Sequence, residues 1–154
     1  ANGLDEIALD GSTWITEMRG GQIDSREICP EDFGIRRRST AHLRVNSPTE
    51  SLTLLRQALT DPDSDAADLV SLNAGAAIYV AGVAISLENG VTMAQDAIAA
   101  GLANERFEEL VRVTKPAGSI FLHNIPKWLT HYATILNRIA HFRHWISWDA
   151  MSAV

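Results

Sequence analysis

Two adjacent carboxylates, Asp5 and Glu6, are the residues of this sequence best suited to chemistry. They follow the turn-forming pair Asn2-Gly3 and precede an apolar, strand-like run, Ile7-Ala8-Leu9. This arrangement is typical of a loop at the end of a strand, and hard cations such as Mg²⁺ prefer carboxylate oxygens in such loops. The sequence therefore predicts a cation-binding loop at residues 5–6. An acidic pair in a solvated turn is the alternative that the two residues by themselves leave open.

A β-hairpin is predicted directly after this loop. Residues 13–18 and 22–28 alternate between apolar and polar side chains, and Gly20-Gly21 lies between them. Paired glycines accept the positive φ angles that tight hairpin turns require. Pro30 ends the second strand, and residues 31–34 are predicted to form a turn.

Several helices are predicted after the hairpin. Ser47-Pro48-Thr49-Glu50 combines a capping serine, a proline at the first helical position and a glutamate three residues after the cap. Residues 65–87 are rich in alanine and glycine, and residues 74–85 are apolar nearly all round, which predicts a buried helix ended by Asn89-Gly90. Two more helices are predicted over residues 92–100 and 104–114. A short sheet followed by four helices indicates an α/β fold.

The composition is ordinary for a globular protein and narrows the function classes. The chain has 154 residues, 46% hydrophobic side chains and a net charge of −6. The acidic balance argues against nucleic-acid binding. The single cysteine, Cys29, excludes an internal disulfide and is typical of a reducing compartment. No apolar run is long enough to span a membrane, so we expect a cytoplasmic protein without membrane contact.

Four segments in this order resemble one known family, the anthranilate phosphoribosyltransferases. The resemblance covers about residues 2–115 and implies the C-terminal part of a nucleoside-phosphorylase/phosphoribosyltransferase-like α/β domain. The segments are Gly3-Leu4-Asp5-Glu6-Ile7, the Gly-Gly hairpin, Pro30-Glu31-Asp32-Phe33-Gly34 and Leu72-Asn73-Ala74-Gly75-Ala76-Ala77-Ile78-Tyr79-Val80-Ala81-Gly82.

The resemblance implies a reaction and a cofactor. The family transfers a phosphoribosyl group from phosphoribosyl pyrophosphate to anthranilate in tryptophan biosynthesis. By similarity, Asp5 and Glu6 correspond to the acidic pair that binds Mg²⁺ on the pyrophosphate, and no catalytic residue is carried over. The family's glycine-rich phosphate loop has no counterpart in these 154 residues, so we expect a fragment of the enzyme that is inactive alone.

Three alternatives stay open. The first is a non-catalytic relative of the same fold that binds nucleic acid, and the second is a structural fragment that associates through its C-terminal tail. The third is a nucleoside phosphorylase of related architecture.

The tail, residues 116–154, differs from the body of the chain. Residues 1–115 carry 10 basic and 18 acidic side chains, whereas the tail carries 3 basic and 1 acidic. We therefore predict a boundary near Lys115 and a helical tail unrelated to the family. Its apolar residues follow a heptad spacing, which predicts a helix with an apolar seam: Trp128, Tyr132, Ile135, Ile139, Phe142 and Ile146. The low charge of the tail favours packing of this seam on its own protein or a homo-oligomer over a membrane surface.

Three further candidates have an ordinary structural explanation. Arg36-Arg37-Arg38 could bind phosphate or nucleic acid, but three arginines in an acidic chain usually form a solvated cluster. His141 and His144 are spaced to share a metal ion on a helix, yet no other ligand type completes the set. Cys29 is predicted to be a half-buried strand residue, because no base lies near it in the sequence.

Overall fold

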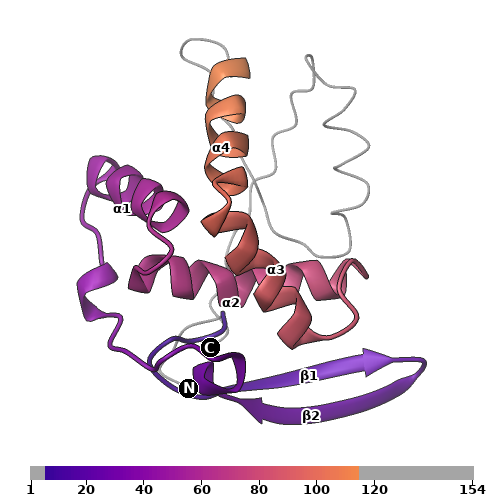
Figure 1. Ribbon diagram of the computed structural model, residues 1–154. Helices are drawn as coiled ribbons and strands as arrows, with labels where there is room; N and C mark the ends of the chain where they lie inside the picture. The colour runs from indigo at the N-terminus through magenta and orange to yellow at the C-terminus, as the bar shows by residue number, and fades with distance from the viewer. Residues whose placement is uncertain (1–5, 115–154) are drawn as a thin grey trace, which may run out of the picture. The chain divides into compact units, whose positions relative to one another are not determined.

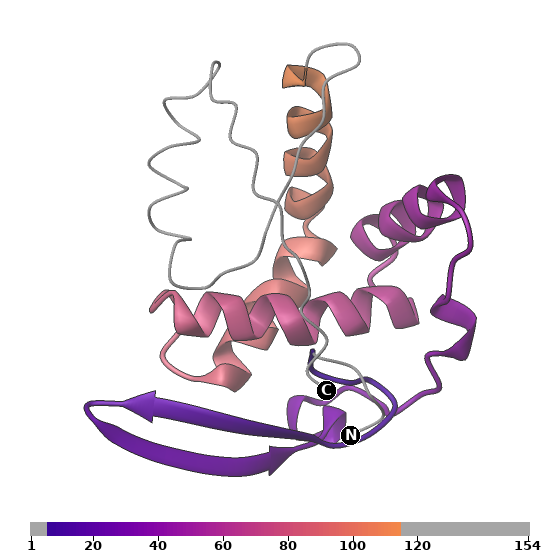
Figure 2. The ribbon, with the colours of Figure 1, turned by 180° about the vertical axis from the view of Figure 1, so that it is seen from behind.

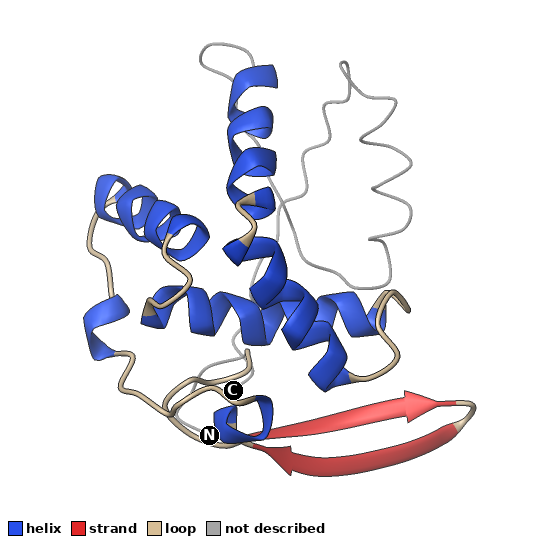
Figure 3. Ribbon diagram, in the orientation of Figure 1, coloured by secondary structure: helices blue, strands red, loops and turns tan. Residues whose placement is uncertain are grey.

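The computed structural model describes residues 6–114 (Figure 1). Asp5, the tail and its predicted heptad helix, and the His141–His144 pair lie outside the described residues. Within this range the chain has two strands, two short 3₁₀ helices and four α-helices, an α/β composition that agrees with the predicted fold class (Figure 3).

The predicted hairpin is confirmed. Strands β1 (Thr13–Arg19) and β2 (Gln22–Ile28) are antiparallel, with Thr13 opposite Ile28 and Arg19 opposite Gln22. Gly20 and Gly21 have φ angles of 58° and 81°, as the two-residue turn requires. Figure 2 shows the strands running side by side to this turn. A 3₁₀ helix, Pro30–Phe33, follows and is capped by Gly34 in the left-handed conformation.

The N-terminal segment is not a strand, contrary to the expectation for Ile7-Ala8-Leu9. Among the described residues, only β1 and β2 pair in a sheet. The backbone of residues 7–9 is instead bonded to side chains and to a loop. Ala8 N–H donates to Thr13 Oγ1 over 3.0 Å, and Leu9 C=O accepts from Arg38 N–H over 3.2 Å. The N–H and the C=O of Ile7 are both hydrogen-bonded to the side chain of Asn73.

Serine caps begin three of the helices. The side chains of Ser47, Ser64 and Ser86 each accept a backbone N–H from the first turn of α1 (Pro48–Thr60), α2 (Asp65–Val80) and α3 (Leu87–Ala99). The predicted start at Ser47 is therefore confirmed. Helix α4 (Leu102–Val113) begins after Gly101, whose φ is 75°.

The prediction of one helix over residues 65–87 was wrong. Helix α2 ends at Val80, Gly82 takes a φ of 74°, and Ser86 then caps α3. Asn89-Gly90 lies inside α3 instead of ending a helix, because the Ser86 side chain accepts Asn89 N–H. The expected full burial of residues 74–85 also fails, since Val83 and Ile85 in the connection are 64% and 84% exposed.

Helices α2 and α3 form the most extensive contact between helices in the described part of the chain (Figure 1). Gly75 on α2 and Gly90 on α3 are both buried at this contact. A Cβ atom on Gly75 would lie 2.5 Å from the backbone N and Cα of Val91, so only glycine permits this close approach.

One apolar cluster joins the N-terminal segment to these helices. Leu9, Ile35, Leu72 and Val91 are at most 3% exposed, and Ile7, Phe33 and Leu69 pack against them. The segment that follows the acidic pair is thus part of the core.

Candidate functional site

Glu6 is the one member of the acidic pair that lies in the described residues. Its side chain is exposed. Among residues 6–114 it forms no hydrogen bond or ion pair, which leaves its carboxylate oxygens available to a ligand. No group of three or more His, Cys, Asp or Glu side chains within residues 6–114 is arranged to hold a metal ion. A cation here would therefore depend on the acidic pair and on ligands from elsewhere.

The backbone after Glu6 is fixed by Asn73 of helix α2. Asn73 Oδ1 accepts the Ile7 N–H over 2.9 Å, and Asn73 Nδ2 donates to the Ile7 C=O over 3.0 Å. The same Nδ2 donates to Leu69 C=O on α2, also over 3.0 Å. We call these three hydrogen bonds the Asn73 bridge. A primary amide can form it because it carries both an acceptor and two donors.

A polar network holds the loop that follows Ile35 against the start of α2. Arg38 Nη1 donates to Asp65 and, over 3.1 Å, to Asp68 Oδ2. His42 Nε2 lies 3.1 Å from the second oxygen of Asp65. Burial raises the pKa of Asp68, the charge of Arg38 acts to lower it, and the neighbouring carboxylates Asp65 and Asp63 raise it further.

The three consecutive arginines have different surroundings. Arg37 pairs with Glu31 through its Nε, 3.2 Å from Oε1, and Arg38 is bonded to α2 as described. A backbone hydrogen bond lowers the pKa of Glu31, and Arg37 lowers it further. Arg36 is exposed. Since two of the three cations are paired with carboxylates, the arrangement favours a structural role over phosphate binding.

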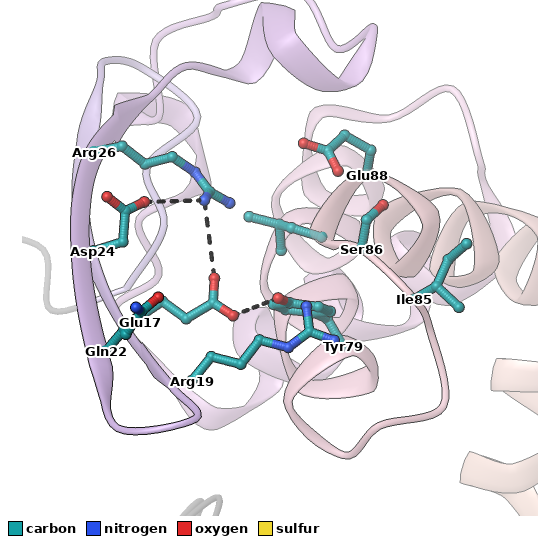
Figure 4. Close-up of a pocket in the computed structure, with 10 residues that line it drawn as sticks. Glu17, Arg19, Gln22, Asp24, Arg26, Tyr79, Ile85, Ser86 and Glu88 are labelled. Carbon is teal, nitrogen blue, oxygen red and sulfur yellow. Dashed lines mark hydrogen bonds and ion pairs between the residues drawn. The ribbon is translucent and has the colours of Figure 1, made fainter.

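An open hollow of about 590 Å³ lies between the hairpin and the α2–α3 connection (Figure 4). Tyr79 on α2 donates to Glu17 on β1, and this hydrogen bond raises the pKa of Tyr79. Arg26 lies 3.9 Å from Glu17 and 3.7 Å from Asp24. Three carboxylates and two guanidinium groups line the hollow, so opposite charges nearly balance and no strong excess charge selects a charged ligand: Glu17, Asp24, Glu88, Arg19 and Arg26.

Cys29 is half-buried as predicted, but it is not a strand residue. It lies just after β2, where its N–H donates to Asp32 Oδ2 over 2.7 Å. None of the described helices combines the length and hydropathy that crossing a bilayer would require.

Sequence reasoning named Glu6 as a candidate and Arg38 only as one member of the arginine cluster, and it missed the Asn73 bridge and the pairing of Arg38 with Asp65 and Asp68. Asn73 is 66 residues from Ile7 along the chain. Its only sequence signal is a polar residue inside a largely apolar helix. Such a residue usually has a hydrogen-bonding partner when the helix packs.

Comparison with known proteins agrees with the resemblance seen in the sequence. The chain is 46% identical over 114 residues to the anthranilate phosphoribosyltransferase of Acidovorax sp. (strain JS42), a match covering 74% of this chain and 33% of that protein. It is 48% identical over 118 residues to the enzyme of the same name from Cellvibrio japonicus (strain Ueda107), covering 74% and 34%. The chain spans about a third of the length of these relatives.

The sequence model of the glycosyl transferase family, a/b domain, matches residues 1–104. This match includes the acidic pair, the hairpin, the Pro30–Phe33 turn, Asn73 and helix α3. Neither comparison favours the nucleic-acid-binding alternative. About two thirds of this chain matches the a/b domain of the glycosyl transferase family, and the chain belongs to that family.

Proposed function

We propose that this chain is part of an anthranilate phosphoribosyltransferase, which joins the phosphoribosyl group of phosphoribosyl pyrophosphate to the amine of anthranilate. The observation that carries the proposal is the 46–48% identity to enzymes of that name over 114–118 residues. An identity of this size over most of the described fold supports a shared reaction more strongly than fold likeness alone does.

Within this enzyme, Asp5 and Glu6 would hold Mg²⁺. The residues fit this ion, because Mg²⁺ is commonly bound through one or two carboxylates while it keeps water and substrate phosphate as its other ligands. Glu6 is exposed and unpaired among the described residues, as a ligand shared with a substrate must be. When bound, Mg²⁺ neutralises negative charge on the departing pyrophosphate.

The chain's own residues would supply position and orientation. Hydrogen bonds of the backbone hold residues 7–9, the segment after the acidic pair, against α2, β1 and the loop that contains Arg38. Such fixed placement lowers the cost of organising the site when substrate binds. The sequence contains no glycine-rich phosphate loop, so we expect the 154-residue chain by itself to form no product.

A chimera tests the proposal. Residues 1–114 would replace the matching segment of the Acidovorax relative, and anthranilate consumption would be followed by its fluorescence. We expect the folded chimera to form phosphoribosyl anthranilate, whereas the 154-residue chain alone does not. A chimera that folds and binds phosphoribosyl pyrophosphate yet consumes no anthranilate would contradict the proposed reaction.

The cytoplasmic location, the homo-oligomeric state and the domain boundary near Lys115 stay predictions. Analytical ultracentrifugation of the 154-residue chain would test the oligomeric state.

A further inference from the structure

The Asn73 bridge joins a rigid helix to the backbone beside the acidic pair. Both main-chain polar groups of Ile7 are bonded to a single side chain, at 2.9 and 3.0 Å. This is the pairing that a neighbouring β-strand would provide, and here an amide side chain provides it. The bridge therefore fixes Ile7 in both translation and rotation relative to α2.

Helix α2 is itself well fixed at this point. Leu72, one residue before Asn73, is fully buried, and Gly75, two residues after Asn73, packs against Val91. The side chain of Ile7 packs on the same apolar cluster as Leu72. Since packed interiors resist displacement, the position of α2 determines where the backbone of Ile7 lies.

Glu6 is bonded directly to Ile7 along the chain, and its exposed side chain is not held by any described residue. The nearest fixed point to the Glu6 carboxylate is thus the Asn73 bridge. Groups that orient a metal ligand without touching the metal commonly change metal affinity by about 10–100-fold when removed.

We propose that Asn73 is a positioning residue for the cation-binding acidic pair, holding Glu6 in place through the backbone of Ile7. This inference rests on the proposed role of Asp5 and Glu6 in binding Mg²⁺. Asn73 touches neither metal nor substrate in this scheme. Its contribution is the orientation of the chain that carries the ligand.

A double-mutant cycle on the 154-residue chain separates positioning from plain stabilisation. The preformed Mn²⁺–pyrophosphate complex is the probe, and its binding to the protein is measured by isothermal titration calorimetry. The variants are Glu6→Gln, Asn73→Ala and the double variant. If Asn73 acts through Glu6, its effect on affinity disappears once Glu6 can no longer bind the ion.

Two additional variants keep the test decisive. Ile98→Ala removes a buried side chain of α3 that lies outside the cluster holding Ile7, so it lowers stability without disturbing the bridge. Asn73→Gln retains the amide but shifts it by one methylene, and it replaces Asn73→Ala if the alanine variant does not fold. Faster hydrogen exchange at the Ile7 amide would show directly that the bridge is broken.

We expect Asn73→Ala to weaken Mn²⁺ binding by about tenfold, with no further loss in the Glu6→Gln background and no loss for Ile98→Ala. If Glu6→Gln leaves affinity unchanged, the metal role of the acidic pair fails, and the inference fails with it. If Glu6→Gln weakens binding but Asn73→Ala does not, only the positioning role is overturned. The positioning role is likewise overturned if Ile98→Ala weakens Mn²⁺ binding as much as Asn73→Ala does. It is also overturned if the losses of affinity in Asn73→Ala and Glu6→Gln add up in the double variant.

Discussion

Replacing Gly75 with alanine is predicted to separate the two helices that organise this fold. A Cβ atom at this position would lie 2.5 Å from the backbone N and Cα of Val91 and 2.6 Å from Val91 Cγ2. Ordinary contact between such atoms is about 3.5–4.0 Å. Two of the three neighbours are backbone atoms, so the strain cannot be relieved by rotating a side chain. Helix α3 must move away from α2 by about 1 Å to restore ordinary contact.

The expected cost is the difference between two terms. Alanine is favoured over glycine within a helix by up to about 1 kcal/mol. Overpacking in a well-packed interior costs about 1–3 kcal/mol and occasionally more. Because the clash involves backbone at the largest helix contact, we take the upper end of that range, which leaves a net loss of about 2 kcal/mol. At roughly 4 °C per kcal/mol for a domain of this size, Tm falls by about 8 °C.

The assay is unfolding of Gly75→Ala by urea and by heat, each monitored by far-ultraviolet circular dichroism. Gly11→Ala is the matched control, because a Cβ at Gly11 meets no atom within 4 Å and its φ lies outside the positive region. We expect the control to be neutral or slightly stabilising. A Gly75→Ala variant as stable as the control would refute the close helix approach described here.

Three other predictions follow from single contacts. Ser64→Ala should lower the free energy of unfolding by about 1–2 kcal/mol, a larger loss than for Ser47→Ala. The reason is that Ser64 is buried and its hydroxyl both accepts from Ala67 N–H and donates to Asp61 C=O. Equal losses for the two variants in urea unfolding would contradict this prediction. Glu17→Gln should lower the pKa of Tyr79 in a spectrophotometric titration, since the hydrogen bond to Glu17 raises that pKa, and an unchanged titration would show that the bond is absent. Because folding raises the pKa of Asp68, the stability that Asp68 contributes is fully present below the unfolded pKa of 3.8 and is lost as pH rises through the higher folded pKa. Asp68→Asn should therefore reduce the fall of the urea midpoint with rising pH. A variant with the same dependence of the urea midpoint on pH as the original chain would contradict this prediction.

The sequence predicted correctly those turns and helix starts that depend on residues adjacent in the chain. The hairpin was predictable because Gly20 and Gly21 supply the positive φ angles of its turn. The start of α1 was predictable because Ser47, Pro48 and Glu50 each favour that position, and Glu50 also accepts Asn46 N–H over 2.8 Å. In these places local preference and tertiary structure agree.

The α2–α3 connection shows where local reading fails. Asn-Gly is a strong turn signal, yet Gly90 is buried in α3, where its lack of a side chain permits contact with Gly75. In this fold Gly90 permits close packing of two helices and does not form a turn. Only the partner helix reveals this, because the contact joins residues distant in the sequence.

The candidate site divides in the same way. The acidic pair was visible as a motif, whereas Asn73 and Arg38 act across 66 and about 30 residues of chain. A side chain that bonds to backbone far along the sequence leaves no spacing pattern that could be recognised. The proposed ligands could thus be named from a local motif, but the residues that hold the neighbouring backbone in place could not.

The Mg²⁺ dependence of the chimeric enzyme tests the central claim most directly. Glu6→Gln would be compared with Glu105→Gln, which removes an exposed carboxylate of α4 that forms no side-chain bond among the described residues. We predict that Glu6→Gln raises the Mg²⁺ concentration needed for half-maximal activity by about tenfold or more, while Glu105→Gln leaves it unchanged. The same Mg²⁺ dependence in both variants would contradict a cation site at the acidic pair.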